Sequence, residues 1–132
     1  MNGPRVLIVD DNVLNVILAR AVLSADGFEI ESAASAQELA QQIGAFRPEL
    51  ILMDIQLPGV DGLELTRQLK AEPSTQHIVI VAFTAFAMRG DEPKMRAAGC
   101  DGYVAKPIDV NRFAAQIRLL LRPLPSGLPD LP

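Results

Sequence analysis

Three carboxylates follow short apolar runs in the sequence. Asp10 and Asp11 come directly after residues 5–9 (RVLIV), and Asp54 comes directly after residues 50–53 (LILM). Unbroken apolar runs of this length indicate strands covered on both faces, and the carboxyl ends of parallel strands collect at one edge of a sheet. A lone aspartate in such a place would be explained well enough by a turn or a helix cap. Three of them predict a functional site.

A hydroxyl group and an ammonium group follow two further runs. Thr84 comes after residues 78–83 (IVIVAF) and Lys106 after residues 101–105 (DGYVA), so both are expected at the same sheet edge. Asp54 ends the middle strand, which makes it the expected nucleophile for forming an acyl phosphate. Lys106 would pair with the phosphoryl charge, and the Thr84 hydroxyl would donate to another phosphoryl oxygen.

The acidic cluster also predicts a cation. Two carboxylates 4 Å apart repel by about 4 kcal/mol at an effective dielectric constant of about 20. Lys106 can neutralise one charge, and hard oxygen ligands beside room for water suit Mg²⁺. We expect Asp11 and Asp54 to bind Mg²⁺, with the backbone carbonyl of Gln56 as a further ligand and Asp10 acting less directly.

Five strand-helix units are predicted to position these residues. The strands are expected at residues 5–9, 28–32, 50–53, 78–83 and 101–105, and a helical pattern follows each of them. Ser35, Asp61 and Asp109 are the expected caps of the second, third and last helices. This series predicts an α/β fold in which a parallel five-stranded sheet lies between two layers of helices.

The first helix is expected to run from Val13 to a stop at Gly27. Its apolar residues fall on two adjacent stripes at helical spacing, which is why a helix is expected here. The first stripe is Val13, Ile17 and Ala21, and the second is Leu14, Leu18 and Val22.

Four motifs in this order resemble the response-regulator receiver domain of two-component signalling, a CheY-like family. They are VDDN (9–12), LMDIQLPGVDG (52–62), TAFAMRGDE (84–92) and AAGCDGYVAKPI (97–108). The sequences of these motifs are most similar to those of stand-alone receivers of the DivK type and of receiver modules of hybrid histidine kinases. The resemblance implies a flavodoxin-like sheet of strand order 2-1-3-4-5 and Mg²⁺-dependent phosphorylation of Asp54 by a histidine kinase or histidine phosphotransfer protein. It also implies a cis peptide between Lys106 and either Pro107 or Ala105.

The resemblance further implies a switch. Phosphorylation would draw Thr84 inward and let Tyr103 turn into the vacated space, changing the surface of the fourth helix, fifth strand and fifth helix for a downstream protein target. Tyr103 could instead simply pack at the sheet edge. Gln56 and Phe86 are expected to tune the phosphoryl lifetime by screening attacking water, although Phe86 could equally contact a partner.

Length and composition bear on the domain organisation, the binding partners and the cellular location. The 132 residues predict one domain at residues 1–122, followed by a Pro-rich tail at 123–132 that is either disordered or the start of a linker. The net charge of -4, without a basic run, argues against direct binding of nucleic acid. No apolar run approaches the ~20 residues that would span a membrane. Without an export signal and with Cys100 as the single cysteine, we expect a cytoplasmic location.

Several alternatives stay open. A haloacid-dehalogenase phosphohydrolase would need an aspartate where Gln56 stands, and a nucleotide or flavin site would need a Gly-rich loop after the first strand. Cys100 with His77 could form a thiol nucleophile. A pseudo-receiver would bind a partner without phosphorylation. We expect no enzymatic activity beyond the chain's part in its own phosphorylation and dephosphorylation. The chain is expected to be either a free-standing protein or a receiver excised from a hybrid kinase or larger regulator.

Overall fold

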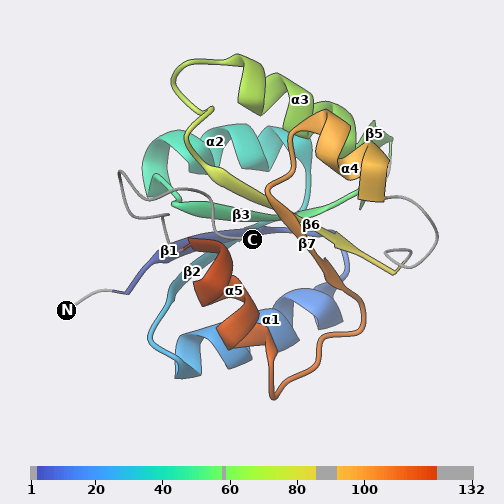
Figure 1. Ribbon diagram of the computed structural model, residues 1–132. Coiled ribbons are helices and arrows are strands. Elements are labelled where there is room, and N and C mark those ends of the chain that lie inside the picture. Colours follow the sequence, from blue (N-terminus) through green and yellow to red (C-terminus); the bar gives the residue numbers. More distant parts are fainter. Residues whose placement is uncertain (1–2, 58, 86–91, 122–132) are drawn as a thin grey trace, which may run out of the picture.

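A computed structural model describes residues 3–57, 59–85 and 92–121 (Figure 1). In this part of the chain, five parallel strands form one sheet in the order β2-β1-β3-β6-β7. The sheet strands are β1 (Arg5–Val9), β2 (Glu29–Ala33), β3 (Leu50–Asp54), β6 (Val79–Thr84) and β7 (Gly102–Ala105). A two-stranded hairpin, β4 (Gln56–Leu57) with β5 (Val60–Asp61), follows β3. The predicted strand order is confirmed, and the predicted tail at 123–132 lies outside the described residues.

Five helices cover the two faces of this sheet within the described residues. They are α1 (Val13–Ala25), α2 (Ala36–Phe46), α3 (Gly62–Ala71), α4 (Glu92–Ala98) and α5 (Phe113–Leu121). Figure 1 shows α1 and α5 on one side of the sheet and α2, α3 and α4 on the other. The predicted three-layer α/β architecture is therefore confirmed. None of the helices in the described ranges is both long and apolar enough to cross a membrane.

The central strands are buried on both faces, as their sequences predict. Every residue of β3 is buried, and alternate β1 side chains belong to different clusters. Val6 and Ile8 pack with residues of α1 and α5, whereas Leu7 and Val9 pack with residues of α2 and α3. The two apolar layers hold the sheet rigidly, which fixes where its carboxyl edge presents polar side chains.

Most of the apolar stripes of α1 do not pack on the sheet. Four of their large side chains are solvent-exposed, at 68% for Val13, 76% for Leu14, 57% for Ile17 and 38% for Leu18, whereas Val22 is half-buried against the core. Ala19 and Leu23 are buried instead. The helix is apolar around most of its circumference, so residue spacing alone could not select the inner face. The result is an exposed apolar surface, Val13, Leu14, Ile17 and Leu18, which we call the α1 apolar face.

Side-chain caps define two helix starts as predicted, and a third start differs. Ser35 accepts a hydrogen bond from the N–H of Glu38 at 3.2 Å, and Asp61 accepts one from Leu63 at 2.8 Å. Asp109 was expected to cap the last helix directly. It instead caps a turn, accepting from the N–H two residues later at 3.0 Å, and α5 begins only at Phe113.

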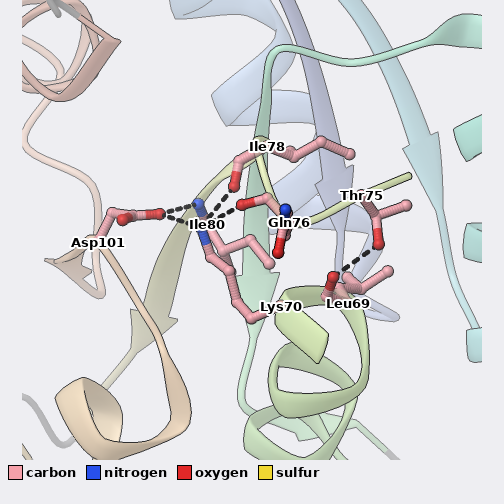
Figure 2. Close-up of polar contacts among 7 residues, drawn as sticks. All are labelled: Leu69, Lys70, Thr75, Gln76, Ile78, Ile80 and Asp101. Atoms are coloured by element: carbon pink, nitrogen blue, oxygen red, sulfur yellow. Dashed lines mark hydrogen bonds and ion pairs between the residues drawn. The ribbon is translucent and has the colours of Figure 1, made fainter. Parts of the chain in front are cut away.

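A lysine connects α3 to the start of two strands (Figure 2). The Lys70 ammonium group donates to the carbonyls of Gln76 at 3.3 Å and Ile78 at 2.8 Å, and to Asp101 Oδ2 at 2.8 Å. The same Asp101 oxygen accepts from the N–H of Ile80 at 2.9 Å. These contacts fasten the amino-terminal edge of the sheet, opposite the edge that carries the predicted site.

We expect Lys70→Met to lower the free energy of unfolding by about 1–2 kcal/mol, because it removes three charge-assisted hydrogen bonds, one of them to the part-buried carbonyl of Ile78. Urea unfolding followed by circular dichroism measures the change. Arg67→Met on the same helix is the matched control, since its ion pair with Glu64 is exposed and its loss should change stability by less than about 0.5 kcal/mol. Equal losses in both variants would contradict the assigned role of Lys70.

Candidate functional site

The strand register brings the predicted site residues to one edge of the sheet. Met53 pairs with Val9 in β1, and Asp54 pairs with Phe83 in β6. Thr84 in turn pairs with Ala105 in β7. The last residues of β3 and β6, Asp54 and Thr84, therefore lie at the same edge as the residues that follow β1 and β7, as predicted from the apolar runs.

Asp10, Asp11 and Asp54 form one acidic cluster. Their carboxylates offer oxygen atoms that lie within 4.8 Å of one another. Asp10 and Asp54 are buried, at 2% and 4% exposure, whereas Asp11 is exposed. The cluster lines an open cleft of about 460 Å³ together with Lys106 and the first turn of α1. Donors of this kind, next to space for water, fit a hard divalent cation.

Lys106 is the cation that the described part of the site supplies. Its Nζ lies 3.2 Å from Asp10 Oδ2 and 3.4 Å from Asp54 Oδ1. The ammonium group also lies 4.8 Å from the centre of the Phe83 ring. The Lys106–Pro107 peptide is cis, which is one of the two bonds that the resemblance offered.

Asp10 is held by donors on the loop and first turn that follow it. The N–H of Asn12 donates to Oδ1 at 2.8 Å, and the side-chain amide of Asn15 donates to Oδ2 at 3.2 Å. Both oxygens of Asp10 thus already have protein partners, which suits the indirect metal role expected for it. Asn15 is a site residue that the sequence reasoning missed.

Asp54 is held by the backbone that follows it. The N–H of Gln56 donates to Asp54 Oδ1 at 2.9 Å. Burial raises the pKa of the Asp54 carboxyl above its ordinary value, and the nearby Asp10 charge raises it further. The Gln56 N–H and the Lys106 charge oppose this rise in pKa without cancelling it.

A glycine lets α3 begin directly behind Asp54. A β-carbon at Gly62 would lie 2.4 Å from the Asp54 carbonyl oxygen and 2.6 Å from the Ile55 α-carbon. Both of these atoms belong to the backbone and cannot turn aside. The VDG segment of the sequence motif therefore serves to bring the helix against the strand end that carries the candidate phosphoacceptor.

The structure places the predicted switch and tuning residues as follows. Thr84 is buried, at 1% exposure, and its carbonyl accepts the N–H of Lys106 at 2.8 Å. Tyr103 lies on the edge strand β7 at 38% exposure, and it lines a small pocket together with Met95 of α4. Gln56 is exposed at the cleft. Phe86 lies outside the described residues.

The structure does not support the alternative in which Cys100 is a thiol nucleophile. Cys100 is half-buried, and burial raises the pKa of its thiol, with a smaller opposing effect from a hydrogen bond with Thr66. A raised pKa keeps the sulfur as a thiol, which is a poor nucleophile.

Comparison with known proteins identifies the family. A family model described as the response regulator receiver domain matches residues 6–118. The chain belongs to this family. The acidic cluster and Lys106 of this receiver lie within the residues that the family model matches. The haloacid-dehalogenase alternative is thereby excluded.

Individual relatives agree with the family. This receiver is 47% identical over 116 residues to the polar-differentiation response regulator DivK of Brucella anthropi, covering 88% of this chain and 94% of that protein. The receiver domain of a Pseudomonas aeruginosa sensor histidine kinase was solved with a magnesium ion coordinated in its active site cleft. It is 29% identical with a TM-score of 0.79, covering 90% of this chain and 98% of that one. The chemotaxis response regulator CheY4 of Vibrio cholerae, 21% identical with a TM-score of 0.82 over 89% of this chain and 98% of that one, shares the fold.

Proposed function

We propose that this receiver accepts a phosphoryl group on Asp54 from a phosphohistidine and thereby signals in a two-component or phosphorelay pathway. One observation carries the proposal. Asp54 is a buried carboxylate at the end of the central strand, with oxygen atoms of Asp10 and Asp11 within 4.8 Å and the Lys106 ammonium group 3.4 Å away. A carboxylate in such surroundings has a nearby cation that can pair with the charge of an incoming phosphoryl group.

The chemistry requires one bond to form and one to break. An Asp54 carboxylate oxygen attacks phosphorus, the P–N bond of the phosphohistidine breaks, and its electron pair returns to the imidazole. The raised pKa of Asp54 favours attack, because the ionised carboxylate is poorly solvated and correspondingly nucleophilic. Lys106 then pairs with the charge on the phosphoryl oxygens, and the Thr84 hydroxyl donates to one of them.

The donor set fits Mg²⁺, since it consists of carboxylate oxygens beside an open cleft. Asp11 and Asp54 would hold the ion together with the backbone carbonyl of Gln56, and Asp10 would act through water. When bound, Mg²⁺ supplies positive charge that offsets the carboxylates and the phosphoryl oxygens. The Pseudomonas relative described with magnesium in its cleft supports the assignment.

The partner that donates the phosphoryl group is proposed to be a histidine kinase or a histidine phosphotransfer protein that docks on the α1 apolar face. Val13 and Leu14 belong both to this face and to the lining of the cleft. A donor that brings a histidine to Asp54 along this wall of the cleft would cover these exposed side chains. An apolar surface next to a charged cleft suits a partner that covers the apolar surface while its histidine reacts in the cleft.

The output is proposed to be a change in the surface formed by α4, β7 and α5, to which a downstream protein binds. Thr84 and Tyr103 would couple this surface to Asp54. If the Tyr103 ring keeps one rotamer with and without a beryllofluoride phosphate mimic, that coupling is wrong. Gln56 and Phe86 remain the proposed tuning residues. We further propose a cytoplasmic protein that is no enzyme on other substrates and binds neither nucleic acid nor membrane.

Incubation with acetyl phosphate and Mg²⁺, followed by intact-mass measurement, tests the proposal. We expect the native chain to gain the mass of one phosphoryl group and Asp54→Asn to gain none. A native chain of unchanged mass would leave the pseudo-receiver alternative, in which partner binding needs no phosphorylation. Transfer profiling against candidate kinases then identifies the phosphodonor.

A further inference from the structure

Lys106 serves two carboxylates at once. Its ammonium group lies 3.2 Å from Asp10 Oδ2 and 3.4 Å from Asp54 Oδ1. If Asp54 is phosphorylated, as proposed above, negative charge moves from its carboxylate to phosphoryl oxygens further out in the cleft. Lys106 must follow that charge to pair with it, which weakens its contact with Asp10.

Asp10 then depends more on its remaining donors, because it is 2% exposed and a buried carboxylate with too few hydrogen bonds is costly. Its Oδ1 keeps the backbone N–H of Asn12, at 2.8 Å. Its Oδ2 is the atom that Lys106 would give up. The side-chain amide of Asn15 reaches that same oxygen at 3.2 Å.

The Asn15 side chain is in place for this task without being required by the helix. Its backbone N–H is already capped by the side chain of Asn12, at 3.1 Å. Its side-chain amide donates to Asp10 from a half-buried position in the first turn of α1, at the wall of the cleft. An amide donates without adding charge, so it does not compete with Lys106 for the phosphoryl group.

We propose that Asn15 is a positioning residue that holds Asp10 through Oδ2 when Lys106 moves from Asp10 to the phosphoryl group. The inference rests on the proposed function of Asp54. It assigns Asn15 a larger effect on the phosphorylated state than on the resting state, because Lys106 helps to hold Asp10 only in the resting state. Residues that orient metal-site carboxylates in this way typically change affinity by about 10- to 100-fold when lost.

The test compares Asn15→Leu, which keeps the approximate shape but removes the donor, with Asn15→Gln, which restores an amide. Beryllofluoride serves as the phosphoryl mimic, and its affinity is measured by calorimetry at saturating Mg²⁺; Mg²⁺ affinity without the mimic is measured separately. We expect Asn15→Leu to bind beryllofluoride about 10-fold more weakly, with a smaller change in Mg²⁺ affinity, and Asn15→Gln to recover most of the loss. Gln41→Leu likewise replaces an amide side chain with leucine, at an exposed position of α2, and should behave as native.

The outcomes separate the two proposals. If Asn15→Leu loses stability to urea but binds beryllofluoride as the native chain does, Asn15 has a structural role only and the inference is overturned. An equal loss of Mg²⁺ affinity and beryllofluoride affinity also overturns it, since the contact would then matter equally in both states. A native chain that neither binds the mimic nor accepts a phosphoryl group refutes the proposed function itself.

Discussion

Ile17→Asp is expected to slow phosphoryl transfer from a phosphohistidine protein by about 100-fold, which corresponds to about 2.7 kcal/mol. The reason is that a desolvated charge would be placed within the α1 apolar face when the donor docks. Ile17 is 57% exposed, so the substitution removes little packing from the fold itself. Transfer is measured with a purified kinase or phosphotransfer protein selected by transfer profiling.

Acetyl phosphate provides the internal control for this prediction. It reaches Asp54 without covering α1, so its rate with Ile17→Asp should stay within about twofold of the native rate. Leu119→Asp is the matched surface variant, because Leu119 is 64% exposed on α5 and outside the α1 apolar face. Equal losses with both phosphodonors, or the same loss in Leu119→Asp, would show that α1 is not the docking surface.

The location of the site could be predicted from sequence because it depends on strand ends. Apolar runs such as residues 50–53 are buried on both faces, so their carboxyl ends are well defined and share an edge of the sheet. The motif around Asp54 also specifies local geometry, since Asp61 caps α3 and Gly62 allows that helix to start against the strand. These features are encoded by neighbouring residues and need no knowledge of the tertiary packing.

The inner face of α1 and the role of Asn15 could not be predicted in the same way. Ala19 and Val13 are both apolar, and only the packed layers determine that Ala19 is buried while Val13 is exposed. Asn15 falls five residues after Asp10, and an asparagine in the first turn of a helix is ordinarily explained by solvent exposure. Its contact with Asp10 depends on how the loop between β1 and α1 folds back over the strand end.

Removing divalent metal should make Asp54→Asn more stable than the native chain at neutral pH, by about 1–2 kcal/mol. A like-charged pair at 4 Å costs about 4 kcal/mol at an effective dielectric constant of about 20, and the attraction of Asp54 to Lys106 offsets part of this. The chain has no tryptophan, so urea unfolding in EDTA is followed by circular dichroism. Glu72→Gln removes an exposed acid outside the cluster and should change stability little.

The pH dependence of this difference has a definite sign. The folded-state pKa of Asp54 is raised above 3.8, mainly by burial, so the unfolded chain ionises at lower pH than the folded chain. The Asp54 carboxyl contributes its full stability to the native chain below the pKa that it has in the unfolded state. This contribution is lost as the pH rises through the higher pKa that Asp54 has in the folded state. The advantage of Asp54→Asn should therefore shrink as the pH is lowered from neutral towards 3.8. A constant difference would contradict the electrostatic explanation.

Saturating Mg²⁺ should reverse the order of stability. Ligand at 100 times its dissociation constant adds about 2.7 kcal/mol to a fold that binds it, and Asp54→Asn lacks one proposed ligand. Asp11→Asn should also lose most of this gain. In Asp11→Asn, however, the buried pair of Asp10 and Asp54 is intact, so its metal-free stability should stay closer to native. The two variants thus separate repulsion within the cluster from binding of the ion, and a native chain that Mg²⁺ fails to stabilise would rule out the metal site.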